Sequence, residues 1–182
     1  HSVATLLGWL LILLTLGFSP TFIPSALANE PAKTIPTQLT IPAIGLNSSV
    51  VPVGLRQVTV NGQTYGQWLV DDNLVSWHNL SAQPGQVGNT VLNGHSNIHA
   101  QVFRHLPEVE IGDKILITSG DKQYQYLIAQ KIMVKEKGVS VEQRVKNAQL
   151  IMPTSDERIT LVTCVGPEAA YRLIIIAFPV AP

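Results

Sequence analysis

The chain has 182 residues, enough for one well-buried domain and an additional segment, and its formal net charge at pH 7 is zero. Charged residues make up only 13% of the chain, so the composition provides no basic surface for nucleic acid, and we expect no nucleic-acid partner. There is one cysteine, which excludes an intramolecular disulfide.

The amino-terminal region is apolar. The first 29 residues contain no Asp, Glu, Lys or Arg, and residues 3–23 are long enough to span a bilayer core of roughly 30 Å. Residues 25–29 alternatively offer the small-x-small pattern of a signal peptidase site. We predict that residues 1–28 form a hydrophobic membrane anchor or signal segment. The anchor is the favoured interpretation, and a buried core helix is the third. An anchor or a signal would place the rest of the chain outside the cytoplasm.

A linker and a series of short strands follow. Residues 29–38 are polar, contain two prolines and lack periodicity, which predicts a linker. Asn61-Gly62 lies between two β-type runs and predicts a hairpin with a type I′ turn. The predicted strands cover residues 39–42, 49–53, 57–60, 66–70, 89–93, 114–118, 124–134, 159–164 and 173–178.

Helical signal is limited to two short segments. Residues 99–106 predict two helical turns before Pro107, and residues 141–150 predict another short helix. Many strands at short spacing with so few helical residues are typical of a closed antiparallel barrel or a sandwich. We therefore expect an all-β domain over residues 39–182.

Three chemically capable side chains stand near the ends of predicted strands. Cys164 ends the run 159–164, Arg172 follows eight positions later, and His95 follows the strand at 89–93. A thiol, an imidazole and a guanidinium are suited to acyl transfer, as nucleophile, proton donor or acceptor, and stabiliser of a developing oxyanion. In an exported domain an unpaired cysteine suggests a reactive thiol or an intermolecular bridge, and a buried structural cysteine is the alternative.

Several stretches resemble, in the same order, those of the sortases, the membrane-anchored cysteine transpeptidases of bacterial surfaces. They match the first strand, the histidine segment, the turns that follow it, the cysteine strand and the arginine strand: residues 39–46, 84–95, 102–106 with 111–113, 160–164 and 171–173. The resemblance covers roughly residues 38–180. It implies a closed eight-stranded sortase-type β-barrel with one or two short helices, preceded by an N-terminal hydrophobic helix.

The resemblance also implies roles and partners. Cys164 corresponds to the nucleophile, His95 to the acid/base, and Arg172 to the residue that stabilises the oxyanion or the substrate backbone. The implied substrate is a C-terminal sorting motif of a secreted surface protein. The implied acceptor is an amine of a cell-wall cross-bridge or of a pilin lysine. The implied location is the cytoplasmic membrane, with a single span and an extracellular catalytic domain. The short loop between Cys164 and Arg172 and the anchor resemble the smaller class D, E or F enzymes.

Other side chains admit plainer interpretations. Asp71-Asp72 is predicted to form a solvated turn rather than a metal site, and we predict no metal and no cofactor. His78, beside Trp77, is expected to lie near the substrate groove, and we assign it no role. His99 and His105 are expected at the surface or in satisfied packing, and Arg172 could instead pair with Glu168 in the preceding loop.

Two other cysteine enzymes fit the sequence less well. Papain-type proteases place the cysteine before the histidine, whereas His95 precedes Cys164 here. L,D-transpeptidases carry a Ser/Thr-His-Gly run before their cysteine, and Val162-Thr163 occupies that place here. A membrane-anchored, non-catalytic β-barrel binding domain with a buried structural cysteine stays as the alternative function.

Overall fold

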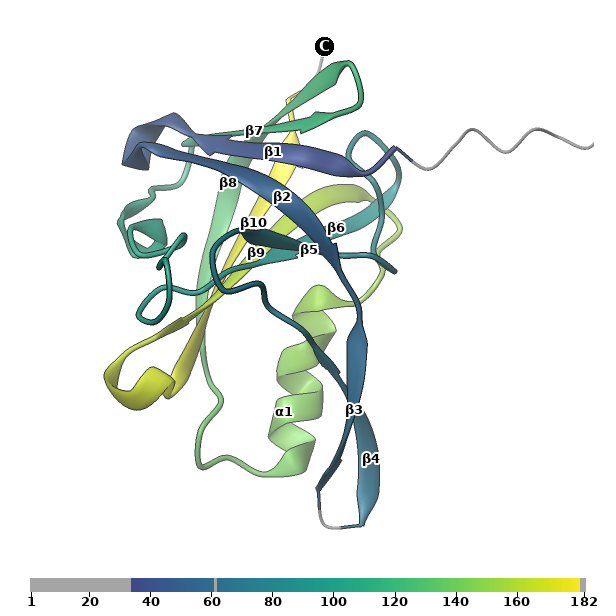
Figure 1. The fold of residues 1–182 in the computed structure, drawn as a ribbon, viewed down its shortest axis with the longest axis vertical. Coiled ribbons are helices and arrows are strands. Elements are labelled where there is room, and N and C mark those ends of the chain that lie inside the picture. The colour runs from purple at the N-terminus through teal and green to yellow at the C-terminus, as the bar shows by residue number, and fades with distance from the viewer. Residues whose placement is uncertain (1–33, 61, 181–182) are drawn as a thin grey trace, which may run out of the picture. The chain divides into compact units, whose positions relative to one another are not determined.

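Eight strands close into a barrel in the computed structural model, which describes residues 34–60 and 62–180 (Figure 1). These strands are β1 (Pro36–Ile41), β2 (Leu46–Val53), β5 (Val75–His78), β6 (Gly88–Asn93), β7 (Lys114–Ser119), β8 (Lys122–Lys135), β9 (Glu157–Val165) and β10 (Tyr171–Pro179). Around the barrel they follow the order β1-β2-β5-β6-β9-β10-β8-β7. The predicted all-β class and eight-stranded closure are confirmed, and closure excludes the sandwich.

The core lies inside the barrel. Along β9 and β10 alternate side chains point inward, so Leu161, Leu173 and Ile175 pack in the interior while their neighbours face outward. The other inward residues come from every strand and from the 102–109 segment; the fully buried large ones include Leu39, Ile41, Trp77, Leu92, Phe103, Leu106, Ile115, Ile117, Tyr126, Ile128 and Ile159. The apolar runs predicted as core strands therefore do form the core.

The barrel is not purely antiparallel, in contrast to the prediction. β2 pairs in parallel with β5, and β6 pairs in parallel with β9. Parallel neighbours need a long crossover connection. The segment between β2 and β5 is one such crossover, and the segment between β6 and β9 is the other. The prediction missed the parallel pairs because a pattern of short strands along the sequence does not show which strands become neighbours.

A separate two-stranded sheet stands outside the barrel. β3 (Leu55–Val60) and β4 (Gln63–Trp68) pair only with each other within the described residues. Val60 is the register partner of Gln63, so the loop has two residues, and Gly62 has the positive φ of 77° that such a turn requires. The predicted hairpin is confirmed, although its second strand begins at Gln63 rather than at residue 66.

The helical predictions have mixed outcomes. The segment 99–106 is not helical: it forms turns followed by a 3-10 helix, η2 (Leu106–Glu108). His99 and Gln101 have φ values of 54° and 53°, in the left-handed region, which prevents a continuous helical turn.

The second predicted helix is confirmed as α1 (Val141–Ala148), capped by the Ser140 side chain and followed by η3 (Gln149–Ile151). Two further 3-10 turns are η1 (Pro42–Ile44) and η4 (Pro167–Ala169). In Figure 1, α1 and the β3–β4 hairpin lie below the barrel.

The predicted hydrophobic segment at residues 1–28 lies outside the described residues. Within 34–60 and 62–180, no helix has both the length and the apolar character needed to cross a membrane. β1 begins at Pro36, three residues before the first predicted strand.

Candidate active site

Cys164 and Arg172 lie directly opposite each other on neighbouring strands. Cys164 is on β9 and Arg172 on β10, and the antiparallel register pairs their Cα atoms. Directly opposed residues project to the same face of a sheet, with Cβ atoms about 4.5–5.5 Å apart. Leu161 and Thr163 face the barrel interior, so Cys164 and Arg172 project from the outer face. Cys164 is half-buried, which does not agree with the alternative of a buried structural cysteine.

His95 belongs to the chain that leaves the barrel beside the Cys164 strand. β6 runs parallel to β9, and its last register pair is Asn93 with Val162. The contact continues for one more residue, because the Gly94 N–H donates to the Val162 carbonyl at 3.2 Å. His95 stands two residues beyond Asn93, as Cys164 stands two residues beyond Val162. β6, β9 and β10 therefore bring all three predicted site residues to the same end of three adjacent strands.

Two hydrogen bonds hold the histidine segment against the cysteine strand. Thr163 Oγ1 donates to the Gly94 carbonyl at 2.7 Å, and Ser96 Oγ donates to the Cys164 carbonyl. Thr163 is buried, so its bond forms away from water. The predicted site residues were chosen among titratable groups and therefore did not include Thr163 or Ser96. The sequence marks these two residues only by their position: Thr163 precedes Cys164, and Ser96 follows His95.

The Arg172 guanidinium is held by one carbonyl of the loop that precedes β10 and by one at the start of β10. Its Nη1 donates to the carbonyls of Ala169 at 3.2 Å and Tyr171 at 3.4 Å. The alternative pair with Glu168 is not formed, because Glu168 binds Lys137 instead. Within the described residues both bonds of Arg172 use Nη1, so Nε and Nη2 retain donors for an oxyanion or a peptide carbonyl.

The surroundings of His95 favour its neutral form. Burial lowers the pKa of His95 below the usual 6.5, and the neighbouring His99 lowers it further, while Asp72 and Asp71 act in the opposite direction. The His95 and His99 rings are 4.8 Å apart between centroids and are tilted by 48°. A neutral imidazole can accept the proton of a thiol, so this histidine is suited to begin as a base.

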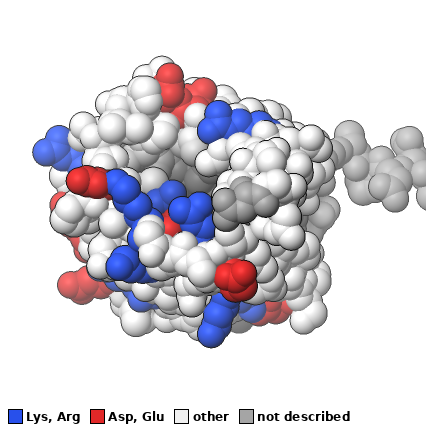
Figure 2. All heavy atoms as spheres, turned by 90° about the horizontal axis from the view of Figure 1, so that it is seen from below, with Lys and Arg blue, Asp and Glu red and all other residues white. Residues whose placement is uncertain are grey.

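A small pocket of about 150 Å³ opens on the outer face beside Arg172. Val162, two positions before Cys164, lines it together with Arg144 of α1 and Glu136. The lining is mixed in charge, and the view from below in Figure 2 shows a hollowed face with basic and acidic side chains beside the hollow. The pocket therefore provides a recess with an apolar floor and charged side chains beside Arg172, the register partner of the predicted thiol.

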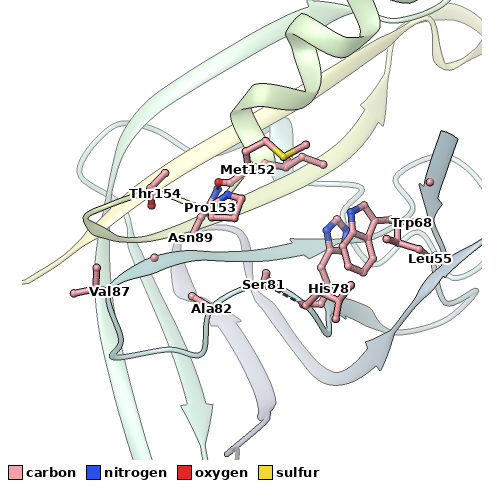
Figure 3. Close-up of a pocket in the computed structure, with 14 residues that line it drawn as sticks. Leu55, Trp68, His78, Ser81, Ala82, Val87, Asn89, Met152, Pro153 and Thr154 are labelled. Carbon is pink, nitrogen blue, oxygen red and sulfur yellow. Dashed lines mark hydrogen bonds between the residues drawn. The ribbon is translucent and has the colours of Figure 1, made fainter.

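A second pocket, of about 510 Å³, contains none of the three predicted site residues (Figure 3). Trp68, His78 and Met152 are among its lining residues, and the Trp68 and His78 rings stack at 4.0 Å between centroids. Asn89, near the start of β6, also lines it, so the pocket lies toward the opposite end of that strand from His95. His78 is thus part of a pocket wall, away from the thiol.

The structure shows the turn predicted at Asp71-Asp72 and the surface position predicted for His105. Asp71 Oδ1 accepts hydrogen bonds from the N–H groups of Asn73 and Leu74, both at 2.9 Å, as expected of a turn. His105 pairs with Glu108 at 2.7 Å at the surface.

One grouping was not predicted. Asp72, His95 and His99 each offer a donor atom, and the three atoms lie within 4.8 Å of one another. Asp72 is 23 positions before His95 in the chain, so sequence spacing gives no signal for this cluster.

Comparison with known proteins places these residues in context. A protein-family model described as a sortase domain matches residues 39–180. Among curated proteins, the chain is 36% identical over 93 residues to Sortase SrtE1 of Streptomyces coelicolor. That alignment covers 50% of this chain and 26% of SrtE1, so it spans about a quarter of the relative's length.

Solved structures share the fold. A Sortase D5 transpeptidase from Clostridium perfringens matches with a TM-score of 0.59 and 23% identity, over 81% of this chain and 79% of the other. A lid mutant of sortase A from Corynebacterium diphtheriae matches with a TM-score of 0.60 and 22% identity, over 85% and 75% of the two chains. At these identities the likeness concerns the barrel fold.

Proposed function

This chain belongs to the sortase family, whose members are cysteine transpeptidases, and we propose that it cleaves a peptide through a thioester on Cys164 and transfers the acyl part to an amine. One observation carries the proposal: Cys164 and Arg172 are register partners on β9 and β10, and His95 leaves the adjoining strand at the same level. The half-exposed position of Cys164 supports a thiol that a substrate can reach.

In the first step, the Cys164 sulfur attacks a backbone carbonyl carbon of the bound peptide. His95 accepts the thiol proton, and the carbonyl oxygen becomes an oxyanion. The Arg172 guanidinium stabilises that charge with donors on Nε and Nη2, while the bonds from Nη1 to two backbone carbonyls keep it in place.

In the second step, the tetrahedral intermediate collapses. The C–N bond breaks, His95 donates its proton to the leaving amine, and the acyl part stays on Cys164 as a thioester. An incoming amine then attacks the thioester carbonyl, His95 accepts a proton from that amine, and the Cys164 sulfur departs as a thiolate and regains a proton from His95. The balance is one amide broken and one amide formed, without oxidant or external energy source.

We propose that the substrate is a C-terminal sorting motif of a secreted surface protein and that the acceptor is an amine of a cell-wall cross-bridge or a pilin lysine. We propose that this transpeptidation takes place at the outer face of the cytoplasmic membrane, with residues 1–28 as a membrane anchor or a signal segment. The name of the relative SrtE1 supports class E among the classes D, E and F. The pocket beside Arg172 would receive side chains of the motif.

The test is thioester capture from a peptide library. The protein is incubated with peptides that end in varied sorting motifs, and mass spectrometry follows the acyl adduct on Cys164 and its release by hydroxylamine. Cys164→Ala should abolish cleavage, and His95→Gln should reduce it strongly. Arg172→Lys, which keeps the charge but loses the planar fork, should reduce kcat/KM by about 100-fold or more.

The matched control is His105→Gln, which removes an imidazole that lies at the surface and pairs with Glu108. It should cleave at the wild-type rate. Native iodoacetamide labelling gives a second readout, because an accessible thiol reacts while a structural thiol stays unmodified. Cleavage by Cys164→Ala would refute the proposal, and so would a thiol that iodoacetamide does not reach in the folded protein.

A further inference from the structure

Two histidines and one carboxylate meet beside the barrel. Asp72 lies in the connection between β4 and β5, His95 follows β6, and His99 lies in the turn after it. His99 Nε2 is 3.3 Å from Asp72 Oδ1, and one donor atom from each of the three side chains lies within 4.8 Å of the others.

The backbone holds these side chains together. The Ala100 N–H donates to the Asp72 carbonyl at 3.1 Å, which joins the two loops that carry the cluster. The Phe103 N–H donates to the His95 carbonyl at 2.8 Å, and Phe103 itself is fully buried in the core. The cluster is therefore positioned by main-chain bonds and a core anchor, and does not depend on side-chain conformation alone.

The distances agree with those around a zinc ion. Zinc binds histidine nitrogen and carboxylate oxygen at about 2.0–2.2 Å, which puts two ligand atoms of a tetrahedron about 3.3 Å apart. The Asp72–His99 pair already has this separation, and the widest pair must close by about 1.5 Å. The side chains of His99 and Asp72 are 42% and 64% exposed, so rotation can supply that movement.

We propose that Asp72, His95 and His99 form a site for a divalent transition-metal ion of the zinc type, with water as a further ligand, and that the ion inhibits the enzyme. Two imidazoles and one carboxylate suit zinc, whereas calcium and magnesium prefer oxygen ligands. A histidine whose lone pair is bound to metal cannot hold a second proton, so His95 could no longer protonate a leaving amine. The inhibition rests on the proposed function, whereas the binding does not.

Calorimetric titration with zinc chloride tests the binding. It compares wild type with the Cys164→Ala protein, in which the thiol cannot contribute a ligand. One ion should bind per chain, and adding Asp72→Ala or His99→Gln should weaken binding by about 10-fold or more. His105→Gln, in the same background, should bind as its parent does. Circular dichroism verifies that each variant is folded.

Three calorimetric outcomes would overturn the site: no binding at millimolar zinc, equal affinity in all variants, or binding by wild type that Cys164→Ala abolishes. The last outcome would assign zinc to the thiol. Inhibition is measured separately, as the ratio of peptide cleavage rates with and without zinc in the wild-type and His99→Gln proteins. The ratio should be low for wild type and rise toward one for His99→Gln.

The two proposals fail in different ways. Zinc that binds at the cluster without slowing cleavage would refute the inhibition. Absence of cleavage in every protein, with zinc still bound by Cys164→Ala, would refute the proposed function and leave the metal site standing.

Discussion

Replacing His78 by phenylalanine should reduce the loss of stability that this fold suffers between pH 7.5 and pH 5. His78 is 2% exposed, its ring stacks on Trp68, and neither ring nitrogen has a hydrogen-bond partner among the described residues. Burial lowers the pKa of His78 from 6.5 to about 3. Unfolding returns the ring to water, where an imidazole has its ordinary pKa of about 6.5.

The sign and the size follow from these two pKa values. Between them, the unfolded chain binds the proton and the folded protein does not, so stability is fully present above about pH 6.5 and falls as the pH falls toward 3. The linkage relation gives a loss of about 2 kcal/mol between pH 7.5 and pH 5, and of about 4 kcal/mol by pH 3. The first interval is the more useful one, because Asp156, whose pKa the hydrogen bonds from Arg158 hold below its usual 3.8, contributes only at lower pH. His95, whose pKa burial also lowers, contributes equally in wild type and in the variant and cancels when the two are compared.

Urea unfolding at pH 7.5, 6 and 5, followed by tryptophan fluorescence, measures the effect. Phenylalanine keeps an aromatic ring against Trp68 and has no titratable nitrogen. Wild type should lose about 2 kcal/mol more than His78→Phe between pH 7.5 and pH 5. His105→Phe, which removes an exposed imidazole, is the matched control and should follow wild type within about 0.5 kcal/mol. Equal losses in wild type and His78→Phe would refute the reasoning.

Three further substitutions test how the site is supported. Thr163→Val should cost about 1–3 kcal/mol in urea unfolding, because it leaves the Gly94 carbonyl without its buried donor; an unchanged midpoint would contradict this. Gly94→Ala should lower the melting temperature and slow alkylation of Cys164 or peptide cleavage, because the new Cβ would lie 2.7 Å from Val102 Cγ1. A wild-type melting temperature with wild-type rates would contradict this. Asn89→Ala should speed limited proteolysis of the segment 136–156, because Asn89 Nδ2 donates to two carbonyls of that segment. An unchanged rate of proteolysis would show that these two bonds do not hold the segment in place.

The parts of the fold that could be predicted are those with a strong local pattern. The apolar runs at 159–164 and 173–178 form β9 and β10, and Asn61-Gly62 marks the hairpin turn. β5 was not predicted, because Val75–His78 is only four residues long, and its apolar and polar residues alternate over too short a stretch to mark a strand, although all four are buried. The 99–106 helix was wrong because left-handed backbone at two residues overrides the apolar spacing.

The candidate site also contains residues that the sequence indicates and one that it does not. Cys164, His95 and Arg172 could be chosen because their chemistry and strand-end positions are visible in the chain, and the register of β9 with β10 brings two of them face to face. Asp72 could not be chosen, because its approach to His99 depends on two segments that are distant in the sequence and are joined by the bond from the Ala100 N–H to the Asp72 carbonyl. Contacts between distant loops follow from the closed fold and leave no periodic signal in the sequence.

The register pairing of Cys164 with Arg172 has a consequence for protein engineering. The Cα positions of Cys164 and Arg172 are set by the strands β9 and β10, whereas the connecting residues 166–170 bridge the end of that ladder and hold the guanidinium through the Ala169 carbonyl. Extra chain inserted before Glu168, whose exposed side chain pairs with Lys137, would leave the Cα register of the pair unchanged, provided that the Ala169 carbonyl keeps its bond to Arg172. This loop is therefore the natural place to graft a recognition segment or a reporter peptide.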